Sequence, residues 1–590
     1  MIEHEPSGCG RLLTGLLMLL AGCGQPQEAS RPDAQAIVIG AGLSGLSAAV
    51  EMGQSGVEVL VIDMNSVAGG HAILAGGVAL VGTPVQAAAG IEDSPDLAYS
   101  DWMAWTEDGD AEWTRFYAEQ SREMIFDWVT EMGVEFVRAA PGHGNSVPRF
   151  HFTRGRAVHL VLPLLRTALG MQNVSFLWNS RAQELLVEDE RISGVVVKNL
   201  RSGELQTLFA PNVVLATGGF ESDLERVLQN WTPGLPRPDR LLIGSAVSST
   251  GSGHDMAIDA GAALRRIDRH YIYINGVADP RDPERSHALT GGNDDSMWVN
   301  AKGQRFTNET GFDRDILVDL LHQVPSTYWA IFDQNSRDGF RVRGASWLKN
   351  PGPAHPILDN PQTAKKASSL RELAAQAGLP ADALEQSVTR FNAMIEAGED
   401  TDFGRFSAAA EAPASIGQAP FYAVQMFPMT RKNMGGVAID RQARALDQQG
   451  NVIAGLYAVG ELNGSVGING KYGLDGMFLG PAIITGRLAG QSIAATVPAG
   501  QRTTTAVPST AKPSATAPDN SNRESTVTAA DLETLLAASR DGYWHFETSH
   551  ALVLERDYDC VLCHSAAVPF SPSNSRQGLL AQTRLCLHCH

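Results

Sequence analysis

The chain has 590 residues, of which 43% are hydrophobic, and a formal net charge of −19. This length is enough for two or three hydrophobic cores, and the composition is that of an ordinary globular protein. The acidic balance argues against nucleic acid as a partner, because binding to phosphate backbones needs clustered positive charge. Basic electron carriers would suit such a protein better.

An apolar run near the N-terminus, from Leu12 to Ala21, ends in Leu20-Ala21-Gly22-Cys23. It is too short to span a bilayer after processing, and it resembles a bacterial lipoprotein signal with its cleavage motif. We therefore expect residues 1–22 to be removed and a lipid on Cys23 to anchor the protein on the periplasmic side of a bacterial membrane. Glu3 and Glu5 make the leader unusually acidic, so a disordered apolar tail or a misassigned start codon is the alternative.

Residues 36–63 predict a strand, a glycine turn, a helix to about Gly53 and a second strand that ends at Asp63. In the turn, a GxGxxG pattern, the first glycines let a pyrophosphate approach the helix N-terminus, and the last lets the helix pack on the sheet. An acid about 20 residues further on accepts a hydrogen bond from a ribose hydroxyl. A chance glycine turn is the alternative to a dinucleotide site, whose predicted residues are Gly40, Gly42, Leu43, Ser44, Gly45 and Asp63.

More glycine clusters follow along the chain, and each by itself could be only a loop. They include Gly69-Gly70-His71, Gly76-Gly77-Val78, Thr217-Gly218-Gly219, Gly435-Gly436-Val437 and the stretch Gly455 to Glu461. Together and in this order they resemble the fumarate reductase and succinate dehydrogenase flavoprotein family. The resemblance implies that the dinucleotide is FAD, held also by Gly69, Gly70, Gly76, Gly77, Thr217, Gly218, Gly219 and Glu461.

The resemblance also implies the fold, an α/β protein with a Rossmann-like FAD-binding domain that is interrupted by an α+β capping domain. The FAD-binding domain would comprise residues 33–267 and 432–497, and the capping domain residues 268–431. Within the capping domain, apolar residues at steps of three and four predict a helical stretch from Ser369 to Glu399 that packs in a core.

Arg314 lies in the segment Gly303 to Asp315, which resembles the family segment that ends in a proton-donating arginine. An arginine normally stays protonated, so Arg314 could instead clamp a substrate carboxylate. A structural ion pair with Asp313 or Asp315 is the third interpretation.

Other positions depart from the fumarate reductases. Arg431 and Lys432 stand where that family has paired histidines before Met-Gly-Gly, and could hold a carboxylate or lie exposed on the surface. Tyr273 stands roughly where the capping domain has a histidine, and the acid and arginine of the family's proton relay fall near Leu289 and Gly292. Fumarate as the substrate is therefore in question.

The segment Val466 to Ile483 is more similar to the ketosteroid dehydrogenase branch of the family. There a tyrosine and a glycine four residues later polarise a ketone, and Tyr472 and Gly476 have that spacing. The alternative is that Tyr472 only packs over the flavin.

The C-terminal region contains two CxxCH motifs, which are typical of covalent c-type haem. Residues 498–535, rich in Thr, Ser, Ala and Pro, predict a flexible linker to a dihaem cytochrome c module at residues 536–590. A zinc ribbon is the alternative, and His588 competes as an iron ligand. Since Cys9 and Cys23 lie in the leader and at the lipid site, no cysteine remains for a disulfide. The predicted attachment residues are Cys560, Cys563, Cys586 and Cys589, and the predicted iron ligands are His564, His590, His545 and His550.

FAD together with two covalent haem c groups resembles the flavocytochrome c fumarate reductases. The resemblance implies an exported oxidoreductase that reduces or forms a C=C bond beside the carbonyl or carboxylate of an enoate, keto or steroid-like substrate. Its haems would exchange electrons with a quinol-linked or soluble cytochrome. The alternatives are a ketosteroid dehydrogenase-like enzyme that passes electrons to a cytochrome, and an electron-transfer flavocytochrome without substrate turnover.

Overall fold

The computed structural model describes residues 32–344 and 355–503. The predicted lipoprotein signal and Cys23, most of the linker, and the dihaem module with all of its cysteines and histidines lie outside the described residues. Within the described ranges no helix is long and apolar enough to cross a membrane, and no cluster of three or more His, Cys, Asp or Glu side chains is arranged to hold a metal ion.

A nine-stranded sheet forms the first domain, with the strand order β6-β2-β1-β10-β22-β8-β7; β21 pairs with β22 and β9 with β8. Strands β6, β2, β1, β10 and β22 are parallel, and short runs of Val, Ile and Leu suit such strands because a parallel sheet is buried on both faces. The bounds are β1 Ala36–Ile39, β2 Val59–Ile62, β6 Val174–Leu177, β7 Ser180–Glu188, β8 Arg191–Asn199, β9 Leu205–Phe209, β10 Val213–Leu215, β21 Arg444–Leu446 and β22 Val452–Ala458.

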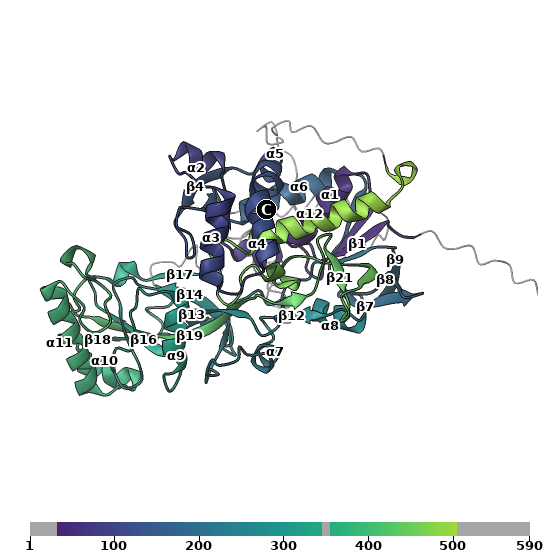
Figure 1. Cartoon of the computed structure of the whole chain (residues 1–590). Coiled ribbons are helices and arrows are strands. Elements are labelled where there is room, and N and C mark those ends of the chain that lie inside the picture. The colour runs from purple at the N-terminus through teal and green to yellow at the C-terminus, as the bar shows by residue number, and fades with distance from the viewer. Residues whose placement is uncertain (1–31, 345–354, 504–590) are drawn as a thin grey trace, which may run out of the picture.

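Three helices pack together beside this sheet: α1 (Leu43–Gln54), α6 (Val158–Gly170) and α12 (Leu479–Thr496) (Figure 1). Two glycines set how closely α12 approaches α1. A Cβ on Gly486 would lie 2.3 Å from the carbonyl oxygen of Ser44, and one on Gly490 would lie 2.7 Å from the Cβ of Glu51. Because β22 and α12 come from the C-terminal segment, two separated parts of the chain build one Rossmann-like domain. This confirms the predicted α/β class and the FAD-binding domain.

A second sheet of eight strands has the order β15-β16-β19-β13-β14-β17, with β11 and β18 paired to β19. Strand β19 (Phe421–Asn433) is the central strand of this sheet, since it pairs with β11, β13, β16 and β18 and is buried along most of its length. Figure 1 shows this sheet and its helices to one side of the first domain. The other strands are β11 Leu242–Ile243, β13 His270–Ala278, β14 Ala288–Gly292, β15 Met297–Val299, β16 Tyr328–Phe332, β17 Arg341–Arg343 and β18 Ala364–Ala367.

The predicted helical stretch from Ser369 to Glu399 is two helices in the structure, α10 (Leu370–Ala377) and α11 (Ala381–Ala397). The prediction of one stretch was wrong because Gly378 ends α10 in the left-handed conformation (φ +71°) and Pro380 is the N-cap of α11. The predicted packing is present: Leu373, Leu379, Leu384, Val388 and Phe391 are buried in one apolar core.

Smaller elements complete the described part of the chain. Near the pocket described below, β3 (Val78–Ala79) joins β4 and β5 in a three-stranded sheet, and β12 pairs with β20. Helix α9 (Asp313–Leu321) carries Arg314 in its first turn. The remaining bounds are β4 Phe136–Ala140, β5 Phe150–Thr153, β12 Leu264–Arg265, β20 Gly436–Val437, α2 Pro84–Ala88, α3 Pro95–Thr106, α4 Ala111–Ser121, α5 Trp128–Glu131, α7 Leu224–Gln229 and α8 Ser252–Asp259. The boundaries of the capping domain stay a prediction.

Candidate active site

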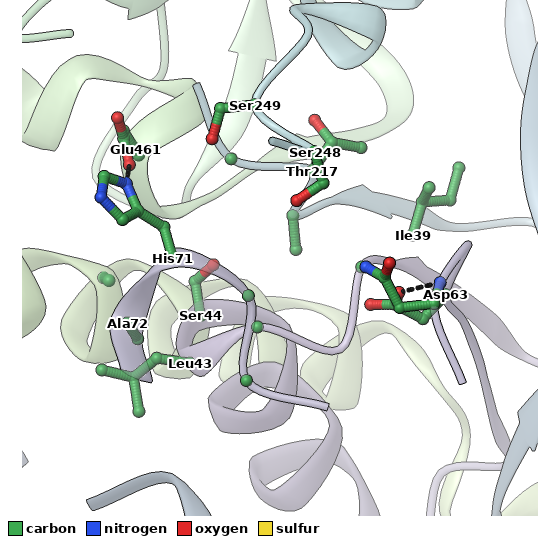
Figure 2. Close-up of a pocket in the computed structure, with 18 of the residues that line it drawn as sticks. Ile39, Leu43, Ser44, Asp63, His71, Ala72, Thr217, Ser248, Ser249 and Glu461 are labelled. Carbon is green, nitrogen blue, oxygen red and sulfur yellow. Dashed lines mark hydrogen bonds and ion pairs between the residues drawn. The ribbon is translucent and has the colours of Figure 1, made fainter. Parts of the chain in front are cut away.

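A pocket opens where β1, β2 and β10 end and α1 begins (Figure 2). In open parallel sheets ligands bind outside the carboxyl ends of the strands. Most of the residues predicted to bind a dinucleotide line this pocket, namely Gly40, Gly42, Leu43, Ser44, Asp63, Gly69, Gly70, Thr217, Gly218 and Glu461.

The glycine turn shapes the pocket floor through close backbone approaches. Gly40 has φ +110°, and a Cβ there would lie 2.3 Å from the carbonyl oxygen of Ala216. Gly42 is the N-cap of α1 and supplies no side-chain cap, so the first N–H groups of the helix are left for a ligand. A Cβ on Gly42 would meet no protein atom within 4 Å. This open helix end fits a pyrophosphate.

Asp63 marks one end of the pocket. Its carboxylate accepts hydrogen bonds from the backbone N–H groups of Ala41 and Asn65, both at 2.7 Å. Burial raises the pKa of Asp63 to about 6, although both backbone donors favour the ionised form. An ionised carboxylate in this place accepts from ribose hydroxyls, so the pocket fits the adenosine half of FAD at the Asp63 end.

His71 and Glu461 lie at the end opposite Asp63 (Figure 2). The His71 Nδ1 and the Glu461 Oε2 are 3.2 Å apart. Glu461 also accepts a 3.3 Å hydrogen bond from the backbone N–H of Asn433, the last residue of β19. The flavin half of FAD would face this end.

Two cations from β19 line the pocket beside an aromatic cluster. The Lys432 Nζ lies 4.0 Å from the ring centroid of Phe478, and the Arg431 Cζ lies 5.5 Å from that of Tyr273. Tyr271 stacks on Phe478 with the centroids 5.5 Å apart. Burial lowers the pKa of Lys432 to about 7, and the charge of Arg431 adds to this effect. The predicted alternative of surface exposure is therefore wrong for Arg431, which is buried, and Lys432 is largely desolvated.

Arg431 is held from both sides, because its guanidinium donates to the carbonyl oxygens of Gly244 and Leu74. Within the described residues its Nε has no hydrogen-bond partner. One donor of a buried cation is thus left without a protein acceptor beside the pocket.

Arg314 lies outside this pocket, against Tyr472 and Trp105. Its Cζ is 5.0 Å from the ring centroid of Tyr472 and 4.7 Å from that of Trp105. Within the described residues its carboxylate partner is Asp315, an exposed side chain whose Oδ1 lies 3.6 Å from the Arg314 Nε. The structure therefore brings two predicted site residues, Arg314 and Tyr472, together across the two domains, and it gives little weight to the ion-pair interpretation.

Tyr472 connects this contact to the pocket through its neighbour Gly473. A Cβ on Gly473 would lie 2.9 Å from the ring of Tyr271, and Tyr271 in turn stacks on Phe478 in the pocket wall. A substrate between the cation pair and Tyr472 would thus be bordered by the ends of β13 and β19 and by the loop that contains Tyr472.

Gly45, Gly76, Gly77, Gly219 and Gly476 do not line the described pocket. Gly45 allows close packing, as predicted, and the other four allow close packing as well. A Cβ would lie 1.9 Å from the Gly40 oxygen at Gly45, 3.3 Å from the Phe150 ring at Gly76, 2.1 Å from the His151 oxygen at Gly77, 1.9 Å from the Asn433 Oδ1 at Gly219 and 2.4 Å from the Ala79 nitrogen at Gly476.

The sequence reasoning missed several lining residues, namely His71, Ser248, Ser249 and Phe478, and the neighbouring Tyr271. For His71 a signal was available, since it directly follows the glycine pair Gly69-Gly70. For Phe478 and Tyr271 there was none, because their contact joins residues far apart in the sequence.

Comparisons with known proteins agree with this geometry. A model of the FAD binding domain family matches residues 35–479. A cytochrome-type fumarate reductase of Shewanella frigidimarina is 32% identical over 464 residues, covering 78% of this chain and 76% of the relative. A KsdD-like steroid dehydrogenase of Mycobacterium tuberculosis is 29% identical over 550 residues, covering 79% and 96%. The solved open conformation of a flavocytochrome c3 fumarate reductase aligns with a TM-score of 0.66 and 28% identity over 78% of each chain.

Proposed function

The chain belongs to the fumarate reductase and succinate dehydrogenase flavoprotein family, and from this premise we propose that it reduces or forms a C=C bond beside a carbonyl or carboxylate. It is an FAD-dependent oxidoreductase that acts on CH–CH groups. FAD, when bound, supplies the hydride chemistry. The observation that carries the proposal is the pair Arg431, which is buried, and Lys432, which is partly buried, in the wall of the FAD pocket.

Arg431 and Lys432 would bind and polarise the oxygen atoms of the substrate. Charge-assisted N–H···O bonds are about twice as strong as neutral ones, and they count most where negative charge grows in a site that excludes water. Arg431 has an unpartnered Nε within the described part of the chain, and the pKa of Lys432, lowered by burial to about 7, leaves it able to hold or release a proton near neutral pH.

Arg314 would act from the other side as an anchor, held by Trp105 and Tyr472. Its guanidinium stays protonated, and within the described residues its Nε has no hydrogen-bond partner. Tyr472 would help to polarise a ketone if the substrate has one, whereas Gly476, which does not line the pocket, is given no such role. Whether Arg314 clamps the substrate or donates the proton is decided by the kinetics of its variants, given in the Discussion.

The test is a set of enoates, unsaturated ketones and their saturated analogues, offered to the purified protein while the flavin absorbance is followed. Arg431→Gln and Lys432→Gln should each weaken turnover of the active compound by at least about tenfold, the effect of losing about 1.4 kcal/mol. Lys471→Gln is the matched control, because Lys471 is an exposed lysine paired with Glu107 outside the pocket. Wild-type turnover by both pocket variants would overturn the proposal.

A ketosteroid dehydrogenase-like reaction is the second candidate. The aromatic side chains of Tyr271, Tyr273 and Phe478 beside the pocket favour it, because they offer apolar area to a ring system, and one similar protein is named a KsdD-like steroid dehydrogenase. A 3-ketosteroid that reduces the flavin, together with inactive dicarboxylates, would support this reaction. If no compound changes the flavin absorbance, the alternative that the protein transfers electrons without turning over a substrate is favoured.

We also propose that electrons pass between FAD and a cytochrome partner through two covalent haems at the C-terminus. Two CxxCH motifs and the upstream histidines His545 and His550 support this proposal. The full chain should keep haem peroxidase staining on denaturing gels, and its mass should exceed that of the apoprotein by two haems. Stoichiometric zinc without covalent haem would refute it.

We propose further that a lipid on Cys23 anchors the protein on the periplasmic side of a bacterial membrane, as the leader ending in Leu-Ala-Gly-Cys suggests. Cys23→Ala should release the protein into the soluble fraction. An unmodified mature N-terminus at another residue would contradict the anchor.

A further inference from the structure

His71 is a buried imidazole that lines the pocket, with one ring nitrogen paired and the other without a partner among the described residues. Its side chain is 9% exposed, and its Nδ1 pairs with the Glu461 Oε2 at 3.2 Å. Among the described residues its Nε2 has no hydrogen-bond partner, although it is buried. His71 and Glu461 both line the pocket, opposite Asp63 (Figure 2). A buried polar atom beside an FAD pocket calls for a partner that the protein itself does not supply.

Three charged groups act on this imidazole. Glu461 contacts it from the turn after β22, and Arg431 and Lys432 face it from β19. A second buried pair joins Glu221 to His270 at 2.9 Å, and its Glu221 interacts electrostatically with Glu461.

These surroundings keep His71 neutral. Burial lowers its pKa, the carboxylate of Glu461 opposes this, and the charges of Arg431 and Lys432 lower it further. A neutral imidazole that donates Nδ1–H to Glu461 offers a lone pair on Nε2. The Nε2 of His71 can therefore accept a proton when the negative charge in the pocket increases. The carboxylate of Glu461 would then stabilise the resulting imidazolium.

We propose that His71, positioned by Glu461, takes up one proton from water on Nε2 whenever the bound FAD is reduced. Two electrons and one proton delivered to the FAD leave one negative charge in the pocket. The proton gained by His71 balances that charge, so two protons in total accompany two electrons. His71 is a positioning and charge-balancing residue in this proposal, and no bond to carbon is made or broken by it.

Lys432 is the alternative site for this proton, because burial lowers its pKa to about 7. The two differ in geometry. The Lys432 Nζ lies over the ring of Phe478 and next to Arg431, whereas His71 has a carboxylate in direct contact that stabilises its charged form. The Arg431 guanidinium is a hydrogen-bond donor with no acceptor site, so it does not compete for the proton.

The experiment is a redox titration of FAD in the full-length holoprotein at several pH values, read at wavelengths where any haem bands are isosbestic. For a two-electron couple, each proton taken up lowers the midpoint potential by about 30 mV per pH unit, the equivalent of a tenfold change in equilibrium constant. The wild type should therefore show about 60 mV per pH unit between about pH 6.5 and 8. His71→Asn should show about 30 mV per pH unit.

Two further variants keep the test decisive if His71→Asn fails to bind FAD. His71→Gln should show the same halved slope. Glu461→Gln should also show it over most of this pH range, because this substitution removes the carboxylate that stabilises the imidazolium. His287→Gln is the matched control, because His287 pairs with Asp282 at 3.0 Å away from the pocket, and it should keep the wild-type slope.

A wild-type slope in the His71 variants would overturn the proposal, as would a halved slope in Lys432→Met alone, which would assign the proton to Lys432. The titration needs no substrate. Its failure is therefore distinguishable from failure of the proposed reaction, which the substrate screen tests.

Discussion

Filling the open space at Gly42 tests where the pyrophosphate of FAD binds. Gly42 is the N-cap of α1, with φ −74° and ψ −178°, a conformation that alanine also adopts. A Cβ there would meet no protein atom within 4 Å. In Gly42→Ala the new methyl group therefore occupies only the space into which a phosphate would come.

The structure sets the expected magnitudes. Because alanine is a poorer N-cap than glycine, the substitution lowers the free energy of unfolding by about 0.5–1 kcal/mol. Because alanine also restricts the unfolded chain, the substitution raises the free energy of unfolding by about 0.4–1 kcal/mol. The free energy of unfolding of the apoprotein should therefore change by less than about 1 kcal/mol. Loss of one charge-assisted hydrogen bond from the helix end costs about 1.5–3 kcal/mol, so the Kd for FAD should rise about 10- to 100-fold.

Gly45→Ala is the contrasting variant in the same turn. A Cβ there would lie 1.9 Å from the Gly40 oxygen and 3.1 Å from the Ala216 Cβ. Overpacking of this kind costs about 1–3 kcal/mol, against about 1 kcal/mol gained in helix propensity. Denaturant unfolding of both apoproteins and FAD titration by fluorescence separate the two effects. Wild-type affinity for FAD in Gly42→Ala, with an unchanged fold, would refute the placement of the pyrophosphate.

Three more predictions concern the cations and Asp63. Arg314→Ala should lose about 1.5–3 kcal/mol of stability from three cation–π contacts but at least about 100-fold in turnover. Arg314→Lys should lose mainly affinity if Arg314 clamps the substrate and mainly kcat if it donates the proton. Arg138→Ala removes a similar contact over Phe152, at 4.1 Å, and should keep turnover; equal turnover in the Arg314 and Arg138 variants would exclude both roles. Lys432 should lose its charge as the pH rises through about 7, so KM should rise above this pH in the wild type and not in Lys432→Met; a flat wild-type profile would contradict this role. Asp63 should become protonated as the pH falls through about 6, so FAD should bind up to about tenfold more weakly per pH unit below that value, whereas Asp63→Asn should bind weakly at every pH. A wild-type Kd that does not change between about pH 7 and 5 would refute the role of Asp63.

The sequence by itself determined the nucleotide half of the site. The spacing of Gly40, Gly42 and Gly45 after an apolar strand, with Asp63 at the end of the next one, predicts a glycine turn that can be recognised from this stretch of chain alone. The break between α10 and α11, which the prediction of one helical stretch missed, also has a local signal, because Gly378 and Pro380 stand between two apolar periods. Local backbone preferences of glycine and proline decide such features, and these preferences can be recognised in a few consecutive residues.

Only the tertiary structure decided what faces the flavin. The burial of Arg431 and the partial burial of Lys432 depend on where β19 ends against the first domain, and the contact of Arg314 with Tyr472 joins two domains. The pairing of His71 with Glu461 brings together residues 390 positions apart, and Gly76 and Gly77, which resemble ligand-binding glycines, serve the packing on β5 instead. Such contacts arise when two sheets and their helices pack against each other, and no local pattern of residue types encodes which side chains then meet.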